Sequence, residues 1–155
     1  MDYDALMRKR VIAVIGAGSC DADLHARARE VGRRLGEAGC VVVTGGLGGV
    51  MEAASAGAKE SGALVVGILP DATPASANAS VDVAIATGMG DARNVVLVNT
   101  ADAFVAVGGA LGTLTEIAFA LKRGKRVVSL GSWNIDPAIT VATTPEEAVS
   151  LALAR

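Results

Sequence analysis

Residues 105–116 have the sequence VAVGGALGTLTE, in which an apolar run stops at glycines and continues as a helical pattern. This order is typical of a buried strand, a tight loop and the start of a helix. Glycines let a backbone approach a ligand closely, and the free N–H groups at a helix N-terminus favour an anion such as phosphate. The stretch therefore predicts a phosphate site at Gly108, Gly109 and Gly112, with Thr113 and Thr115 hydrogen-bonding either the ligand or the loop itself.

The same unit of strand, loop and helix recurs along the chain. Strands are predicted at residues 11–15, 41–44, 64–68, 83–86, 103–107 and 126–130, with a short one near 139–142. Helices are predicted between them, and the last one begins with a capping box of Thr144, Pro145 and Glu147. The alternation predicts a Rossmann-like, doubly wound α/β fold: a parallel sheet of six or seven strands with helices on both faces. One domain, residues 1–155, fits this length.

Composition excludes several classes of function. Hydrophobic residues make up 52% of the chain and the net charge is −2, so no basic surplus indicates a nucleic-acid surface. No apolar run reaches about 18 residues and no signal peptide is evident, which favours a cytoplasmic protein that does not enter membranes. Cys20, Cys40 and His25 lack the spacing of metal ligands, so no metal site is expected.

Two further glycine loops follow the first two predicted strands. The loop that begins at Gly16 does not fit a dinucleotide fingerprint, because Asp21 stands where the third glycine belongs and the second strand ends in Thr44-Gly45 with no acid placed to hold a ribose hydroxyl. No Gly-Lys-Ser or Gly-Lys-Thr of a P-loop occurs either. Ligands in such sheets bind at the carboxyl ends of the strands, where these loops fall. Glu52 is either a favourable charge in the first turn of a helix or a minor ligand contact. The predicted contacts in these loops are Gly16, Gly18, Ser19, Gly45, Gly46, Gly48, Gly49 and Glu52.

Arg93 and Glu116 are the charged residues that the pattern brings to the same edge of the sheet. A guanidinium holds phosphate or carboxylate through two hydrogen bonds. Arg93 is either such a contact or a surface arginine on a short helix, and its place after a strand end, on the ligand side of the sheet, favours the contact. Glu116 is either a catalytic carboxylate or the partner of Thr113 in a capping box, since residues 113–116 match T-x-x-E. Residues 71–80 have the composition of a loop and are a candidate flap.

Residues 108–116 resemble the P-G-G-x-G-T-x-x-E motif of the Lonely Guy (LOG) and lysine decarboxylase-like proteins, and residues 44–52 and 67–70 resemble the second signature of that family. The chain is most similar to a short bacterial branch that includes molybdenum cofactor carrier proteins, in which Gly-Asp-Ala-Arg-Asn and Gly-Val-Met-Glu recur. The resemblance implies a homodimer or tetramer, for which residues 117–121 are a candidate contact.

The resemblance also implies one of two functions. In the hydrolytic members a catalytic pair, matched here by Arg93 and Glu116, cleaves nucleoside 5′-monophosphates to free base and ribose 5-phosphate, with no cofactor required. Val107 replaces the proline of the motif and Asn94 replaces a lysine, which favours the alternative of a non-catalytic carrier or binding protein for the molybdenum cofactor or a nucleotide. Either function predicts a phosphorylated small molecule as the partner.

Overall fold

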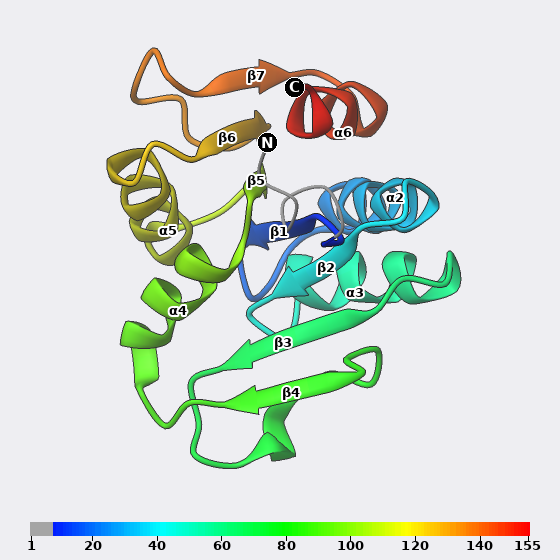
Figure 1. Cartoon of the computed structure of the whole chain (residues 1–155), viewed down its shortest axis with the longest axis vertical. Coiled ribbons are helices and arrows are strands. Elements are labelled where there is room, and N and C mark those ends of the chain that lie inside the picture. The colour runs from blue at the N-terminus through cyan, green and yellow to red at the C-terminus, as the bar shows by residue number, and fades with distance from the viewer. Residues whose placement is uncertain (1–7) are drawn as a thin grey trace.

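The computed structural model describes residues 8–155 as a seven-stranded parallel sheet in the order β4-β3-β2-β1-β5-β6-β7 (Figure 1). The predicted parallel sheet is confirmed, and strand bounds differ from the prediction by about one residue. The third strand begins at Val65, one residue later than predicted, and the N–H of Val65 donates to the carboxylate of Asp82 at 2.9 Å. The strands are β1 Val11–Gly16, β2 Val41–Thr44, β3 Val65–Leu69, β4 Val83–Ala86, β5 Ala103–Val107, β6 Arg126–Leu130 and β7 Thr140–Ala142.

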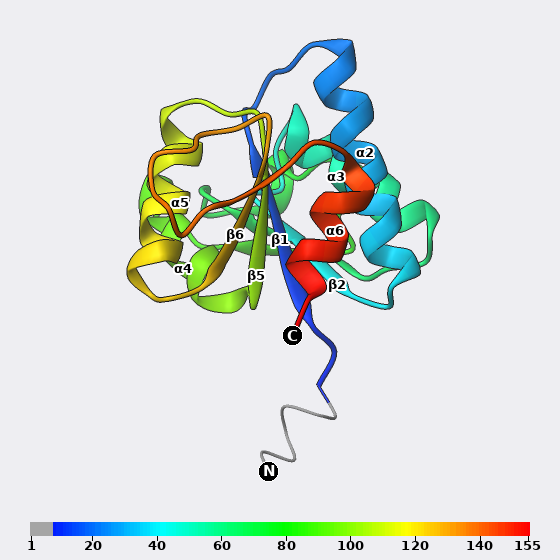
Figure 2. The same ribbon diagram turned by 90° about the horizontal axis from the view of Figure 1, so that it is seen from above.

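Helices cover both faces of the sheet, as the alternation predicts. Figure 2 shows α2, α3 and α6 on one side and α4 and α5 on the other, and each side has its own cluster of buried apolar side chains. Two 3-10 turns, Pro74–Ser76 and Gly90–Ala92, precede β4 and α4. The helices are α2 Ala22–Glu37, α3 Val50–Glu60, α4 Arg93–Thr100, α5 Leu111–Lys122 and α6 Pro145–Leu153.

The order of the strands fixes where a ligand site is expected. The chain moves outward from β1 to β4 and then returns to place β5 on the other side of β1. The last residue of β1, Gly16, lies beside the last residue of β5, Val107. Ligands in open α/β sheets bind outside the carboxyl ends of the two strands at this reversal, and the loops that follow Gly16 and Val107 both begin there.

The start of α6 confirms the predicted cap with one correction. The side chain of Thr144 accepts a hydrogen bond from the N–H of Glu147, 3.1 Å away. The carboxylate of Glu147 does not return to Thr144, and accepts instead from the N–H and hydroxyl of Thr143. A capping box requires reciprocal bonds between the same two residues, so the predicted box is only half formed.

Residues 71–80 form a loop that is tied to the glycine loop after β2. Asn78 donates from its backbone N–H to Gly46 O and from its amide group to Leu47 O, each at 2.9 Å. A flap at this position would therefore carry the loop 45–49 with it.

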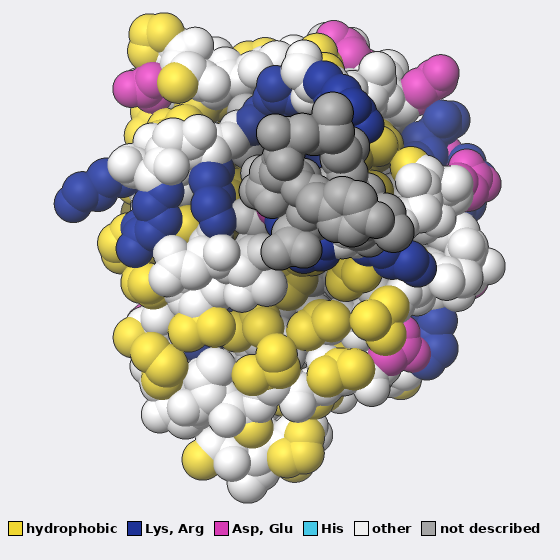
Figure 3. Space-filling view, in the orientation of Figure 1, with side chains coloured by type: hydrophobic (Ala, Val, Ile, Leu, Met, Phe, Trp, Pro, Cys, Tyr) yellow, Lys and Arg dark blue, Asp and Glu magenta, His cyan; other side chains and the backbone are white. Residues whose placement is uncertain are grey.

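One edge of the sheet exposes apolar side chains. Leu64, Val83 and Ile85 are 46%, 45% and 41% exposed. Figure 3 shows a band of hydrophobic side chains over the part of the molecule where Figure 1 draws β3 and β4. The helices α4 and α5 contact mainly β1, β3, β5 and β6. The strand β4 lies at the edge of the sheet, beyond these strands, which leaves Val83 and Ile85 exposed. Within residues 8–155, no helix combines the length and the hydropathy needed to span a membrane.

Candidate functional site

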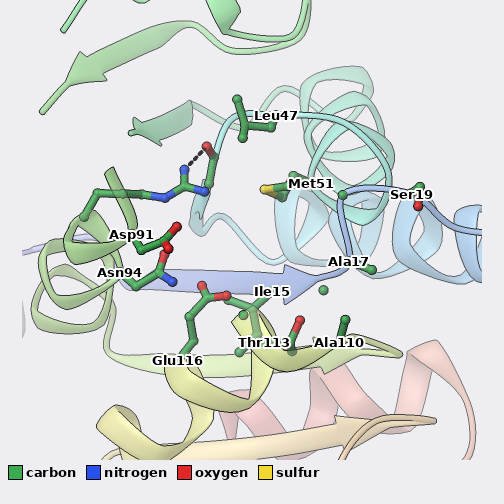
Figure 4. A pocket seen from close by; sticks show the side chains of 15 residues that line it. Ile15, Ala17, Ser19, Leu47, Met51, Asp91, Asn94, Ala110, Thr113 and Glu116 are labelled. Atoms are coloured by element: carbon green, nitrogen blue, oxygen red, sulfur yellow. Dashed lines mark hydrogen bonds between the residues drawn. The ribbon is translucent and has the colours of Figure 1, made fainter. Parts of the chain in front are cut away.

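A cavity of about 480 Å³ opens at the carboxyl ends of β1 and β5, where the strand order reverses. This volume lies in the range of small-molecule sites. Figure 4 shows side chains from several loops and helices directed into it. The residues that line the cavity are Ile15, Gly16, Ala17, Gly18, Ser19, Gly45, Leu47, Met51, Asp91, Arg93, Asn94, Ala110, Gly112, Thr113 and Glu116.

The cavity brings together eight of the residues that the sequence predicts for the site. They are Gly16, Gly18, Ser19, Gly45, Arg93, Gly112, Thr113 and Glu116. The remaining predicted residues lie outside the lining, namely Gly46, Gly48, Gly49, Glu52, Gly108, Gly109 and Thr115. Ligand contact by any of these residues stays a prediction.

The glycines outside the lining shape the backbone of the site. Gly49 has a φ of +62° and lies so close to the preceding loop that a Cβ would stand 2.4 Å from Ala17 O. The next residue, Val50, donates its N–H to the same carbonyl at 3.0 Å. The two glycine loops therefore pack against each other and form one wall of the cavity, and the first N–H of α3 is already used.

Two other predicted contacts have plain structural positions. Glu52 is exposed in the first turn of α3, where its negative charge interacts favourably with the positive end of the helix dipole. Thr115 is exposed, and its hydroxyl donates to Gly112 O at 2.7 Å, so it supports the start of α5.

Sequence reasoning left several lining residues out of the predicted contacts. Asp91 and Asn94 flank Arg93 in the Gly-Asp-Ala-Arg-Asn segment that the resemblance singles out, and this neighbourhood was the available signal. The others carry no polar side chain whose chemistry would attract attention: Ile15, Ala17, Leu47, Met51 and Ala110.

Arg93 is held by the backbone at the ends of two strands. Its Nη1 donates to Gly45 O at 2.5 Å and to Ile68 O at 2.6 Å. Its buried Nε has no hydrogen-bond partner within residues 8–155. Burial lowers the pKa of the guanidinium, while the charge of Glu116 opposes that shift. The interpretation of Arg93 as a surface arginine is therefore wrong, since the side chain is half-buried and fixed in place.

Glu116 is a buried carboxylate with no hydrogen-bond or ion-pair partner among residues 8–155. It is 9% exposed, lines the cavity and accepts no hydrogen bond from any residue of the described range 8–155. Burial raises its pKa to about 7, and Arg93 lowers it by a smaller amount. The capping-box interpretation is wrong, because α5 begins at Leu111 after Ala110, so Thr113 already lies inside the helix.

The first turn of α5 also lacks a side-chain cap. The side chains of Asp21 and Thr144 accept backbone hydrogen bonds at the starts of α2 and α6, whereas Ala110 provides no such bond for α5. An uncapped helix start leaves N–H groups for water or a ligand, and its dipole favours negative charge. The start of α5 at Ala110, Gly112 and Thr113 lines the cavity, so an anion is the ligand group it suits.

The charged groups do not form a metal site. Within residues 8–155, no three His, Cys, Asp or Glu side chains gather as metal ligands would. Cys20 is partly buried and Cys40 buried, and both are free thiols.

Comparison with known proteins identifies relatives along nearly the whole chain. The model of the SLOG cluster4 family matches residues 9–154. An uncharacterized protein of Archaeoglobus fulgidus is 50% identical over 144 residues, which cover 93% of this chain and 95% of the relative.

Solved structures with the same fold include proteins that handle the molybdenum cofactor. The molybdenum cofactor binding protein of Rippkaea orientalis is 37% identical with a TM-score of 0.89, and the match covers 94% of this chain and 96% of that one. The Moco carrier protein of Chlamydomonas reinhardtii is 34% identical with a TM-score of 0.82, covering 92% and 94%. The resemblance to the carrier branch that the motifs predict is confirmed.

Proposed function

We propose that this chain, which belongs to the SLOG cluster4 family, binds the molybdenum cofactor, a phosphorylated pterin, and carries it without altering it. Two solved structures support the proposal, a molybdenum cofactor binding protein and a Moco carrier protein, at 37% and 34% identity. Both similarities extend over more than nine tenths of this chain.

The observation that carries the proposal is the pairing of two features in one cavity. The uncapped first turn of α5 suits a phosphate, and the unpaired carboxylate of Glu116 requires hydrogen-bond donors. A ligand with phosphate at one end and a nitrogen heterocycle at the other satisfies both. Neither feature requires a bond to be broken, so binding alone accounts for them.

Hydrolysis of a nucleoside 5′-monophosphate is the second candidate. It is favoured by one observation: Arg93 and Glu116, the pair implied by the resemblance, line the same cavity. In this reaction water adds to the sugar, the bond from ribose to base breaks, and the base leaves with a proton. A carboxylate beside the sugar stabilises the positive charge that develops there, provided that it is ionised. Burial raises the pKa of Glu116 to about 7, so the ionised form that this reaction needs is less populated at neutral pH than for an ordinary glutamate.

The carrier function predicts that the purified protein holds its cargo. The protein is produced in cells that make the molybdenum cofactor, isolated without denaturation and then denatured. Released pterin is identified by mass spectrometry, and molybdenum by elemental analysis. We expect about one pterin per pocket, and absence of pterin would contradict the proposal.

A matched pair of variants shows whether any cargo occupies this cavity. Gly112 lines the cavity, and within residues 8–155 no atom lies within 4 Å of where its Cβ would stand, so Gly112→Leu adds a bulky side chain to the cavity lining at an open position. Ala26→Leu adds the same side chain at an exposed position of α2. Gly112→Leu should lose the pterin and Ala26→Leu should keep it.

The hydrolase is tested on the same preparations by chromatography with AMP, GMP, CMP and UMP. Appearance of free base and ribose 5-phosphate, together with its loss in Glu116→Gln, would establish the reaction. We expect intact nucleotides from the wild-type protein, as for a carrier.

The remaining expectations about partners are part of the same proposal. A homodimer or tetramer stays a prediction, which light scattering after size-exclusion chromatography tests directly. In the segment 117–121, Ile117 and Ala120 are buried within the chain itself and Ala118 is exposed, so its part in that contact stays a prediction. A cytoplasmic location stays a prediction as well.

A further inference from the structure

The polar groups of the cavity divide between its two ends. In Figure 4 the polar ends of Asp91, Asn94 and Glu116 gather at one end, and Ala17, Ala110 and Thr113 lie toward the other. The second end has the uncapped start of α5 and suits an anion. The first end has the carboxylates of Asp91 and Glu116, the amide of Asn94 and the guanidinium of Arg93, which interacts electrostatically with both carboxylates and whose Nη1 is bound to backbone carbonyls. The carboxylates of this end suit hydrogen-bond donors.

Glu116 needs donors that the protein does not supply. It is nine-tenths buried and accepts no hydrogen bond from residues 8–155. The charge of Arg93 lowers the pKa of Glu116, but its Nη1 donates to Gly45 O and Ile68 O. Arg93 forms no ion pair with Glu116 within the described chain. Leaving a buried carboxylate unpaired is costly. A ligand that brings N–H groups to Glu116 removes this cost.

We propose that Glu116 accepts two parallel hydrogen bonds from the N–H and the adjacent amino group of a 2-amino-4-oxopyrimidine ring, the ring that pterins and guanines share. This inference rests on the proposed function and assigns the end of the ligand opposite its phosphate. Glu116 is then a specificity-determining residue of a binding site.

The geometry of a carboxylate explains the choice of ring. Two carboxylate oxygens accept two parallel N–H bonds, as they do from the fork of an arginine. The 2-amino-4-oxopyrimidine ring presents two such donors side by side. Hypoxanthine keeps the ring N–H and lacks the amino group, while adenine presents one amino group beside a ring nitrogen that is an acceptor. Both leave one carboxylate oxygen without a donor.

Three nucleotides that share one phosphate separate ring recognition from phosphate binding. GMP, IMP and AMP are titrated into the wild-type protein by calorimetry, with chromatography to verify that each stays intact. We expect GMP to bind at least about tenfold more tightly than IMP or AMP, which corresponds to about 1.4 kcal/mol for the lost hydrogen bond to a charged group.

The variant Glu116→Gln replaces one acceptor by an NH₂ group that opposes the donors of the ring. It should weaken the binding of GMP at least about tenfold. The affinities for GMP, IMP and AMP should then lie within about twofold of one another, since the end of the cavity that binds phosphate is unchanged. Glu146→Gln makes the same change at an exposed position of α6 and should keep the preference for GMP. Circular dichroism establishes that each variant is folded.

The comparison of GMP with IMP in the wild-type protein stands even if the Glu116 variant does not fold. Equal affinities for the three nucleotides, no binding of any of them, or a preference for GMP that survives Glu116→Gln would overturn the inference. The carrier function fails by a different result, in which GMP binds with the expected preference while protein from cofactor-producing cells releases no pterin.

Discussion

Arg93 and Glu116 line the same cavity as opposite charges without forming an ion pair within the described part of the chain. The guanidinium is instead fixed to the carbonyl oxygens of Gly45 and Ile68, at the ends of β2 and β3. The carboxylate is buried beside the start of α5, where desolvation raises its pKa to about 7. This arrangement leaves Glu116 free to interact with a ligand. Its consequences for the free energy of unfolding and for the titration of Glu116 are measurable.

The free energy of unfolding of the ligand-free protein should fall as pH rises through the pKa of Glu116. The folded-state pKa of about 7 lies above the ordinary glutamate value of 4.5, so the protonated carboxyl is favoured in the fold. The stabilisation is complete below about pH 4.5 and is lost as pH rises through about 7. The loss is at most about 3–4 kcal/mol, since one pKa unit corresponds to about 1.4 kcal/mol.

Glu116→Gln provides the reference for this measurement, because glutamine cannot ionise. Denaturant unfolding at pH 5, 6, 7 and 8 should show the variant gaining on the wild-type protein as pH rises. Arg93 and Asp91 are the other charged residues of the cavity lining and are present in both proteins. A constant difference between the two proteins across this range would show that the carboxylate is ionised throughout.

Replacing Arg93 should change both stability and the titration of Glu116. Arg93→Met leaves two backbone carbonyl oxygens without their donor, which should cost about 2–4 kcal/mol of unfolding free energy. It also removes the charge that lowers the pKa of Glu116, so that pKa should rise further. Arg93→Lys keeps the charge and should leave the pKa near 7. Carbon-13 NMR of the glutamate carboxyl groups measures the shift, and equal pKa values in both variants would contradict it.

The fold was predictable because its signals are local. Short apolar runs such as 41–44 end in glycines, and helix starts such as Thr144 have side chains that cap them. These patterns depend on backbone geometry and solvent exposure, so the sheet and both layers of helices follow from the sequence alone. The outer strand β4 was predicted as a strand. The exposure of Val83 and Ile85 was not predictable, because it depends on which strands α4 and α5 cover in the folded chain.

The site was predictable only in part, because its residues meet through packing between distant segments. The glycine pattern identified Gly16, Gly45 and Gly112 correctly as lining residues, yet it equally suggested Gly49, which the structure places against Ala17. The T-x-x-E match at Thr113 suggested a cap that the start of α5 at Leu111 excludes. Motif spacing alone does not distinguish a glycine that faces a ligand from one that allows two loops to pack.

Two glycines of the cavity lining should respond oppositely to alanine. Gly112 is helical, and no atom lies within 4 Å of the position that a Cβ would take, so Gly112→Ala should add about 0.4–1 kcal/mol of stability. In Gly16→Ala the Cβ would lie 2.5 Å from Val107 O, a clash that should cost about 1–3 kcal/mol. Denaturant unfolding measures both. A stabilising Gly16→Ala would show that β1 and β5 can separate at their carboxyl ends.

The single tryptophan of the chain should report ligand binding. Trp133 Nε1 donates to Ala110 O at 3.0 Å, and Ala110 precedes α5 in the cavity lining. A phosphate at the start of α5 changes the field and the mobility around this hydrogen bond, so GMP or inorganic phosphate should change the fluorescence of Trp133 with a saturable dependence on concentration. Gly112→Leu keeps Trp133 but adds a bulky side chain to the cavity lining at the start of α5, and its fluorescence should stay constant. An equal change in Gly112→Leu would place the anion elsewhere, because both proteins present the same tryptophan to the solvent.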